Sequence, residues 1–459
     1  MDDIISLEIN YRRNRGRIVM EKITKFIEEK IAPPLIKFSQ MRYVQIMQRT
    51  FITFTGLLIV GSLFLLLASF PMQGYKDFIG EFSKKFAAAS SIGTGFIGLF
   101  VVIAAAFATI EYYNTKKGEN NDILGPVILS VACFLLIVPA QTVKTFIEGA
   151  DPGSFSGVPT EFLGPKGVFA ALIIAIVTCE LYRFLVRKKL VIKMPAGVPP
   201  MVSQAFVALI PSLLIVVFWW LIRVVFDLNI PVMIMSLFQP LVSAGDSPVT
   251  VVSTSLLNRI LWAVGIHGGN VVGSVASPIW TQMNIANQAA MSAGEALPHL
   301  FSGVFYDNYV WIGLAPLSAI MCFSKSKRIK ALGLLSLPAS LFNIGEPLIF
   351  GLPIVMNPLM MIPFVVSYMV IAVVALILVT TGILPVPVLT VPWITPAPIK
   401  TFLATNGSLI AAGFVLVTWV ILAAVFWPFM KALEKSDLKE EEENEKISLD
   451  DEDLSLDIG

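Results

Sequence analysis

Long apolar stretches dominate the first half of the chain and predict a series of membrane-crossing helices. Each is close to the roughly 20 residues that a helix needs to cross the hydrocarbon core of a bilayer. The clearest stretch runs from Phe51 to Phe70 and is stopped by Pro71. Further spans are predicted at about 86–110, 123–143, 167–186 and 203–226.

The pattern changes after residue 228, where the apolar runs shorten and polar residues enter them. These polar residues are Asp246, Asn258, His267, Asn270, Gln282, Asn284, Asn287, Gln288 and Glu295. Prolines and glycines recur in the same region, and broken backbone at membrane depth is tolerated only where protein or a wet cavity borders it. Ordinary spans return at 363–381 and about 409–427. We therefore predict an all-α polytopic membrane protein with about ten transmembrane helices, re-entrant hairpins and amphipathic interfacial helices.

Composition supports this class. Only 14% of the residues are charged and 56% are hydrophobic, with a mean hydropathy of +0.78. A soluble domain has about 25% charged residues, so a soluble protein is excluded. The charged N-terminal stretch lacks the short apolar core of a cleavable signal. Cys133, Cys179 and Cys322 lie in apolar runs without a CxxC spacing, so we expect neither a metal site nor a disulfide framework.

Four regions follow from these changes along the chain. Residues 1–50 are a basic leader, in which residues 21–31 have the spacing of an amphipathic helix on the bilayer surface or of a solvated leader helix. Residues 51–228 form an N-terminal transmembrane domain, and residues 229–430 form a second domain with re-entrant hairpins. Residues 431–459 are rich in Glu and Asp and predict a short disordered cytoplasmic tail.

The basic residues predict the orientation of the chain in the membrane. Cytoplasmic loops carry an excess of Lys and Arg. The basic leader, Lys116 and Lys117, the cluster from Arg183 to Lys193 and the cluster from Lys325 to Lys330 mark one side. We therefore place both termini and these loops in the cytoplasm.

Glu346 is the only carboxylate between Lys330 and the acidic tail. It lies in Asn343-Ile-Gly-Glu346-Pro-Leu-Ile-Phe-Gly-Leu-Pro353, followed by Asn357-Pro358. An ionisable group at membrane depth costs about 3 kcal/mol and is usually kept for function. The flanking glycines and prolines predict a re-entrant hairpin whose tip presents Glu346 to a substrate. The structural alternative is a kinked helix in which Glu346 pairs with a basic group.

Asn343 precedes Glu346 by three residues, so in a short helical turn the two side chains would point to one side. A carboxylate and an amide together suit hydrogen bonds to sugar hydroxyls. Glu346 could also accept a hydroxyl proton as a general base.

His267 is one of two histidines and ends an apolar run in Trp262-Ala-Val-Gly-Ile-His267-Gly-Gly-Asn270. An imidazole there can relay a proton or form a hydrogen bond near neutral pH, although a structural intramembrane histidine would show the same pattern. His299, in Ala-Leu-Pro-His-Leu, is expected to be structural or interfacial.

Trp393 lies between prolines in Pro392-Trp393-Ile-Thr-Pro-Ala-Pro398 and is held rigidly. Its ring could pack on the C–H face of a sugar or belong to an interfacial belt. Asp246 could cap the following helix or line the cavity, and we expect the cap or a structural role. Arg223 and Arg259 could pair with acids or steer a phosphoryl donor, and the sequence does not choose between these roles.

These stretches together resemble the membrane IIC component of the phosphoenolpyruvate-dependent sugar phosphotransferase system, in its lactose/cellobiose/diacetylchitobiose family. The resemblance rests on Gly265-Ile-His267-Gly-Gly-Asn270, on the Asn343 to Pro353 stretch with Asn357-Pro358, and on Pro392 to Pro398. The start of the chain, from Glu21 to Pro34, is also similar.

The resemblance implies a phosphotransferase-system permease that takes up a β-linked disaccharide and presents its C6 hydroxyl to a separate IIB protein carrying a phosphocysteine, with IIA and HPr upstream. It implies a homodimer in lipid, with the dimer interface in the N-terminal domain, and a C-terminal sugar-binding domain that moves as a rigid body, the elevator mechanism. Glu346 and His267 would hold the C6 hydroxyl, with Glu346 as the base. Asn343, Asn270 and Trp393 would line the sugar site, and no cofactor, metal or nucleic acid is implied.

The rival class is an ion-coupled secondary sugar transporter in which Glu346 and His267 relay protons. A carboxylate on a broken helix suits both classes. They differ in what reaches the cytoplasm, which is sugar phosphate in one case and free sugar in the other.

Overall fold

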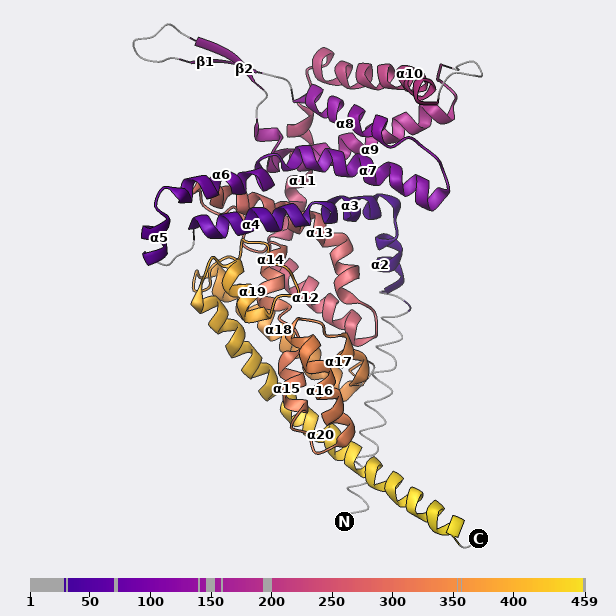
Figure 1. The fold of residues 1–459 in the computed structure, drawn as a ribbon, viewed down its shortest axis with the longest axis vertical. Coiled ribbons are helices and arrows are strands. Elements are labelled where there is room, and N and C mark those ends of the chain that lie inside the picture. The colour runs from indigo at the N-terminus through magenta and orange to yellow at the C-terminus, as the bar shows by residue number, and fades with distance from the viewer. Residues whose placement is uncertain are drawn as a thin grey trace. The chain divides into compact units, whose positions relative to one another are not determined.

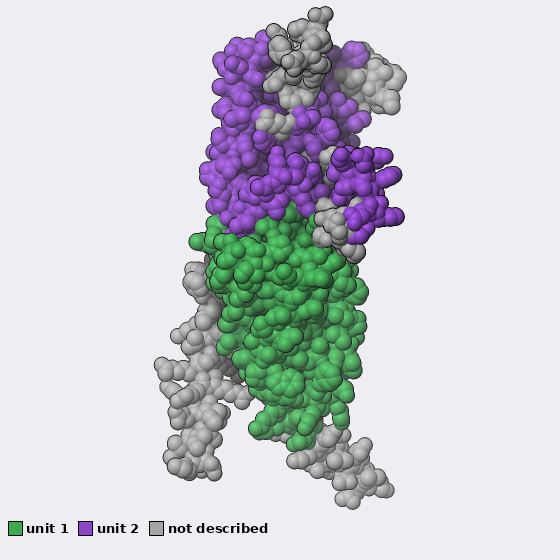
Figure 2. All heavy atoms as spheres, turned by 90° about the vertical axis from the view of Figure 1, so that its left-hand side faces the viewer, with its two compact units in different colours: residues 1–38, 247–273, 304–459 green, residues 39–246, 274–303 purple. Residues whose placement is uncertain are grey.

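A computed structural model of the chain describes residues 29, 32–69, 73–138, 141–145, 153–157, 160–192, 200–352, 354, 355 and 357–456. Apart from residue 29, the predicted amphipathic helix at 21–31 lies outside the described residues. The chain divides into two compact units (Figure 2). Unit 1 comprises residues 1–38, 247–273 and 304–459, and unit 2 comprises residues 39–246 and 274–303.

The described chain is helical apart from one β-hairpin, which confirms the predicted all-α class (Figure 1). The elements before residue 247 are α2 (Ala32–Ser39), α3 (Arg42–Thr53), α4 (Thr55–Ser69), α5 (Gln73–Ile79), α6 (Phe82–Gly95), α7 (Ile97–Lys117), α8 (Leu124–Ile137), β1 (Gln141–Thr145), β2 (Gly153–Gly157), η2 (Thr160–Phe162), η3 (Pro165–Gly167), α9 (Val168–Arg187), α10 (Pro200–Trp220), η4 (Leu221–Val225) and α11 (Ile230–Gly245). The later elements are α12 (Pro248–Ala263), α13 (Gly268–Ala293), α14 (Gly303–Phe305), η5 (Tyr306–Val310), α15 (Ala315–Met321), α16 (Lys327–Leu341), α17 (Glu346–Gly351), α18 (Pro358–Thr380), α19 (Ala397–Ala404) and α20 (Leu409–Leu456). Strands β1 and β2 pair antiparallel, with Thr142 opposite Ser156.

Six helical segments in the described part of the chain are long and apolar enough to cross a membrane. They are Arg42–Ala68, Ile97–Lys117, Pro165–Arg187, Phe206–Val225, Leu359–Thr380 and Leu409–Lys439. Helices α8 and α11 are apolar but shorter. The predicted total of about ten transmembrane helices stays a prediction.

Two predicted spans are wrong in detail. The stretch 86–110 is divided between α6 and α7, with a break at Phe96. The stretch 123–143 is helical only to Ile137, and the chain then enters β1. Hydropathy reports burial or lipid contact but does not mark where the backbone bends, so the apolar average of each stretch outweighed the local signals at Gly95 and Pro139.

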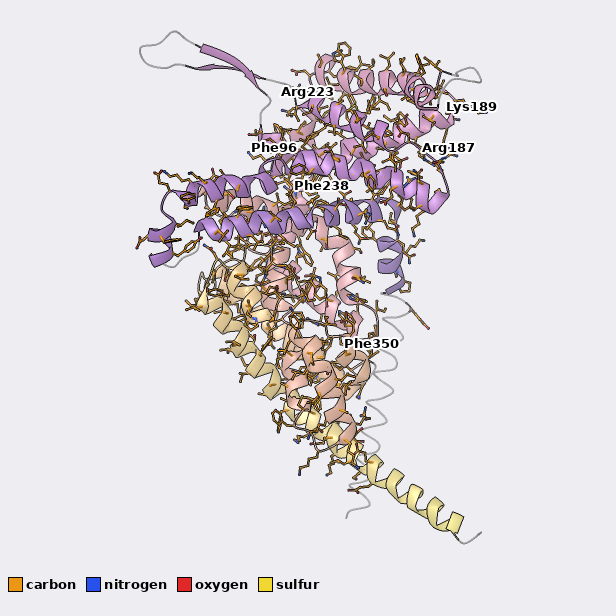
Figure 3. The ribbon with its side chains drawn as sticks, in the orientation of Figure 1. Phe96, Arg187, Lys189, Arg223, Phe238 and Phe350 are labelled. Atoms are coloured by element: carbon orange, nitrogen blue, oxygen red, sulfur yellow. The ribbon has the colours of Figure 1, made fainter. Side chains whose placement is uncertain are left out.

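The core of unit 2 is formed by apolar side chains of α7, α8 and α9, among them Val101, Phe134 and Ala171, which are fully buried. Gly98 permits a close backbone contact, because a Cβ there would lie 2.8 Å from the carbonyl oxygen of Leu163. On α11, Phe238 stacks on Phe169 of α9 with ring centroids 4.3 Å apart (Figure 3).

Arg183 and Glu119 form a bidentate ion pair in unit 2, with Arg183 Nε 2.7 Å from a Glu119 oxygen. The Arg183 hydrogen bond lowers the pKa of Glu119 to about 2. Arg183 also lies over the ring of Tyr113, 3.6 Å from its centroid. Arg183, which belongs to the basic cluster predicted to be cytoplasmic, is therefore paired within the protein. Arg223 likewise pairs with Asp227 at 3.0 Å, one helical turn away (Figure 3).

Asp246 and His299 have structural roles in unit 2. The Asp246 carboxylate accepts hydrogen bonds from the backbone N–H groups of Leu300 and Phe301 and lies 3.2 Å from His299 Nδ1. The backbone of His299 is bonded in turn to Asn287. The expected structural role of His299 is confirmed. Of the roles considered for Asp246, the structural one is confirmed by these hydrogen bonds to residues 299–301, and the helix cap is not, because Ser247 caps α12.

In unit 1, α16 lies directly on α15. A Cβ on Gly333 would be 2.7 Å from the Cβ of Met321, so only glycine fits at this distance. The same helices are joined by hydroxyl hydrogen bonds from Ser318 to Ser336 and Ser340, at 3.2 and 2.9 Å. Buried side chains of α15 to α18 and α20 complete the core.

The long helix α20 continues to Leu456, through most of the region where the sequence predicts disorder (Figure 1). Glu, Lys and Leu are strong helix formers, which gives a physical reason for this continuation. The roles assigned to the two predicted domains, with their boundary at residue 228, stay predictions.

Candidate functional site

The Glu346 segment is a helical hairpin with a broken tip. Helix α16 ends at Leu341, Asn343 has a left-handed backbone with φ of 64°, and α17 begins at Glu346. Proline suits the first turn of a helix, where its missing N–H has no intrahelical partner, and Pro347 occupies that turn. Helix α17 folds back on α16, since a Cβ on Gly351 would lie 2.7 Å from Leu332 Cδ1. The predicted hairpin is present, whereas its re-entrant placement in a membrane stays a prediction.

Asn343 anchors the tip of this hairpin. Its amide nitrogen donates to the carbonyl oxygens of Trp393 and Thr395, at 2.7 Å each. The expectation that Asn343 and Glu346 share one helical turn is wrong, because the left-handed residue separates two helices. Both amide hydrogens of Asn343 are engaged by the 393–395 loop, so this side chain positions the tip. Its direct contact with a sugar stays a prediction.

Replacing Asn343 with Ala is expected to destabilise the protein by about 2–4 kcal/mol. The change removes two hydrogen bonds, each worth about 1 kcal/mol, and forces a residue with a Cβ but no local hydrogen bond into the left-handed region, at about 1–2 kcal/mol. Thermal unfolding of the purified protein measures the loss. Asn343→Gly is the control, because it keeps the backbone conformation and loses only the hydrogen bonds. Equal stability of wild type and Asn343→Ala would contradict the anchoring role.

His267 lies in the turn between α12 and α13. Gly265, with φ of 84°, reverses the chain after α12, and α13 begins at Gly268. A Cβ on Gly268 would lie 2.1 Å from the carbonyl oxygen of Asn258, so α13 starts in direct contact with the backbone of α12. The backbone N–H of Asn270 donates to His267 Nδ1 at 3.1 Å. A neutral His267 therefore carries its proton on Nε2.

The structure brings Glu346 and His267 together. His267 Nε2 is 3.8 Å from Glu346 Oε1, and the side chains are 45% and 48% exposed. This distance is too long for a direct hydrogen bond, but one hydroxyl oxygen could lie about 2.8 Å from both atoms. The imidazole would donate to that oxygen and the carboxylate would accept its proton. The pair is accessible, and its geometry could accommodate an alcohol.

Aromatic side chains lie beside His267. The ring of Trp262 is 4.2 Å from the imidazole of His267, tilted by 45°, and 6.5 Å from the ring of Phe350 (Figure 3). Trp262 is buried, whereas Phe350 is exposed. An aromatic surface beside hydrogen-bonding groups suits a ligand with both C–H faces and hydroxyls.

The other predicted sugar ligands are less closely joined to this pair. Asn270 is exposed and contacts His267 through its backbone. Trp393 is 61% exposed, and its carbonyl is bonded to Asn343. No ring contact or hydrogen bond joins the Trp393 side chain to Glu346 or His267 within the described residues. Contact of these two side chains with a ligand stays a prediction.

Arg259 is buried and lies over the ring of Tyr368, 3.7 Å from the centroid. No acidic side chain pairs with it in the described part of unit 1, and its Nε has no hydrogen-bond partner there. The geometry therefore does not support the predicted ion pair between Arg259 and an acid. Cation–π contact with Tyr368 holds α12 against α18.

Sequence reasoning missed the buried amine of Lys400. Lys400 on α19 is 3% exposed, and the bond from Thr401 Oγ1 to the Asn308 carbonyl places it next to Asp307. Lys400 is the only basic residue between Lys330 and Lys431, which is the same rarity signal that marks Glu346.

The chain is similar to known proteins of one family. The family model for the phosphotransferase system, EIIC, matches residues 48–367. The lichenan permease IIC component of Bacillus subtilis (strain 168) is 34% identical over 446 residues, which cover 93% of this chain and 97% of that protein. The cellobiose-specific EIIC component of Geobacillus stearothermophilus is 33% identical, over 94% of this chain and 98% of that protein.

A solved structure is similar as well. The crystal structure of ChbC, the IIC component of the N,N'-diacetylchitobiose-specific phosphotransferase system, matches with a TM-score of 0.81 and 33% identity. The match covers 91% of this chain and 99% of that chain.

Proposed function

Because this chain belongs to the EIIC family of the phosphotransferase system, we propose that it takes up a β-linked disaccharide and presents the sugar's C6 hydroxyl to a phosphorylated IIB protein. EIIC proteins are multi-pass sugar permeases of the bacterial plasma membrane, and the six candidate spans agree with that class. The substrate class is supported by the names of the relatives, which include permeases for cellobiose, lichenan, oligo-β-mannoside and lactose.

The pairing of Glu346 and His267, 3.8 Å apart and half exposed on broken backbone, carries the proposal. Nε2–H of His267 donates to the C6 oxygen of the sugar and orients it. Glu346 accepts the hydroxyl proton as the oxygen attacks phosphorus. The new bond is between the C6 oxygen and phosphorus, and the broken bond is between phosphorus and the IIB cysteine sulfur, which leaves as a thiolate. Phosphoryl transfer depends mainly on positioning and charge stabilisation, so the permease needs few reactive groups.

The surroundings of the pair support this mechanism. Asn343 fixes the hairpin tip to the 393–395 loop, and the Asn270 N–H fixes the imidazole tautomer. Trp262 packs against the imidazole, and Phe350 lies beside Trp262. Asn270 and Trp393, both exposed, would contact the rest of the sugar.

The proposed assembly is a homodimer with both termini in the cytoplasm. Its interface would lie in the N-terminal transmembrane domain, and the C-terminal domain would carry the sugar across as a rigid body. Cross-linking of the protein in native membranes tests the dimer.

Transport with chemical modification is the expected result in membrane vesicles. Radiolabelled cellobiose supplied with phosphorylated IIB should be recovered as sugar phosphate on the side that holds the donor, because uptake and phosphorylation are one event. Chromatography of the product measures it. Omitting the donor and imposing a proton gradient is the control. Accumulation of free disaccharide under the gradient alone would instead identify an ion-coupled transporter.

A further inference from the structure

The loop between α15 and α16 presents a basic surface with an aromatic residue in it. We define the Phe323 loop as this connection together with the first turn of α16, residues 322–330, which contain four basic and no acidic side chains. Phe323 is 79% exposed. The side chains of Lys325, Lys327, Arg328 and Lys330 are exposed around it. A large exposed aromatic residue among cations is typical of an interaction surface.

Three carboxylates of α20 hold the Phe323 loop through its backbone N–H groups and its side chains. Glu434 accepts hydrogen bonds from the Ser324 hydroxyl, at 2.9 Å, and from the Lys325 N–H. Asp437 forms a bidentate pair with Arg328, with Nε 2.9 Å from Oδ1. These two acids are buried, with 5% and 7% of their surface exposed.

Glu441 completes this set of carboxylates. It accepts from the Ser326 hydroxyl at 2.9 Å and from the Arg328 N–H at 3.3 Å. The hydrogen bond from Ser326 lowers the pKa of Glu441, so this carboxylate stays ionised at neutral pH. Because Glu434, Asp437 and Glu441 are three and four residues apart, they lie on one stripe of α20.

This arrangement separates the charges. The acids of α20 contact the loop backbone, its serine hydroxyls and Arg328, while the side chains of Phe323, Lys325 and Lys330 are exposed. A loop held at its hydroxyls and N–H groups has a fixed shape, so a partner would meet a preorganised surface. Its exposed charge is positive, which fits an acidic patch with an apolar centre.

Helix α16 connects this loop to the proposed reaction site. Ser326 caps α16, accepting from the Ile329 N–H at 3.2 Å, and the Glu346 hairpin follows the other end. Fifteen residues at about 1.5 Å each separate the two ends by about 22 Å. A donor domain of about 100–150 residues has a radius of gyration of about 13–15 Å, so it could contact the loop and still reach toward Glu346.

We propose that the Phe323 loop is the docking surface for the phosphoryl-donor protein, which binds it through an acidic patch with an apolar centre. This inference rests on the proposed function. A flat anionic membrane fits less well, because Glu441 contacts the loop and the exposed Glu442 follows it on α20, so an extended anionic surface would also meet these negative charges. A protein patch can engage the loop alone.

The test is the apparent KM for phosphorylated IIB, measured from initial rates of sugar phosphorylation at saturating cellobiose in detergent. The variant Lys325→Glu/Lys330→Glu should raise this KM at least about tenfold, which corresponds to about 1.4 kcal/mol. The affinity for sugar without donor should stay within about twofold. The wild-type KM should also rise with salt more steeply than that of the variant, because charge contacts are screened. Phe323→Ala should raise KM without changing the salt dependence.

The matched control is Lys116→Glu/Lys117→Glu, which reverses two exposed charges at the end of α7 and should leave KM unchanged. An unchanged KM in the loop variant, or an equal rise in both double variants, would overturn the docking surface. A defect seen in vesicles rich in anionic lipid but absent in detergent would assign the loop to lipid headgroups and overturn it as well. If wild type makes no sugar phosphate, the proposed function fails and this inference with it.

Discussion

Glu346→Gln is expected to reduce sugar phosphorylation by at least about 100-fold while sugar binding stays measurable. Removal of a general base costs about 10²–10⁴-fold in rate. Glutamine keeps the shape of the side chain and can still form hydrogen bonds to a hydroxyl, but it cannot take the proton. Rates with phosphorylated IIB and equilibrium binding of labelled cellobiose measure the two effects separately.

The control for this variant is Glu295→Gln. Glu295 is exposed just after the end of α13, so neutralising it tests whether loss of any accessible carboxylate slows the reaction. Wild-type turnover in Glu346→Gln would remove Glu346 from the mechanism. Equal loss in both variants would show that the effect is not specific to the pair with His267.

Gly268→Ala is expected to lower sugar affinity by at least about tenfold and to destabilise unit 1. The added Cβ would lie 2.1 Å from the Asn258 carbonyl oxygen, so α13 and α12 must separate. His267 immediately precedes this contact and would move away from Glu346. Overpacking of this kind costs about 1–3 kcal/mol or more. Sugar binding and thermal unfolding of the purified variant measure both losses.

Gly413→Ala provides the comparison within the same unit. A Cβ at Gly413 meets nothing within 4 Å, so alanine there should be neutral or slightly stabilising, by up to about 1 kcal/mol. Should Gly268→Ala bind sugar as tightly as Gly413→Ala, the contact between α12 and α13 would not be what positions His267.

The proximity of Glu346 and His267 agrees with what the sequence suggests, because both are rare ionisable residues beside helix breakers in apolar sequence. Their roles stay predictions. The helix-break-helix geometry was predictable for the same reason, since glycine and proline act locally.

What escaped prediction depends on distant contacts or on local backbone shape. The role of Asn343 rests on a positive φ and on bonds to carbonyls 50 and 52 residues away. The contact between Ser324 and Glu434 joins residues 110 apart. The break at Phe96 follows Gly93-Thr94-Gly95, a local signal that the apolar pattern of the whole stretch outweighed.

The close packing of Gly333 against α15 restricts the motions by which the Glu346 hairpin could carry a bound ligand. Because α16 packs directly against α15 at Gly333 and two hydroxyl hydrogen bonds join the helices, α16 cannot slide along α15. Helix α16, the first helix of the Glu346 hairpin, can therefore move only together with α15. A disulfide engineered between α15 and α16 should therefore leave transport intact. If transport required α16 to slide along α15, the disulfide would block it.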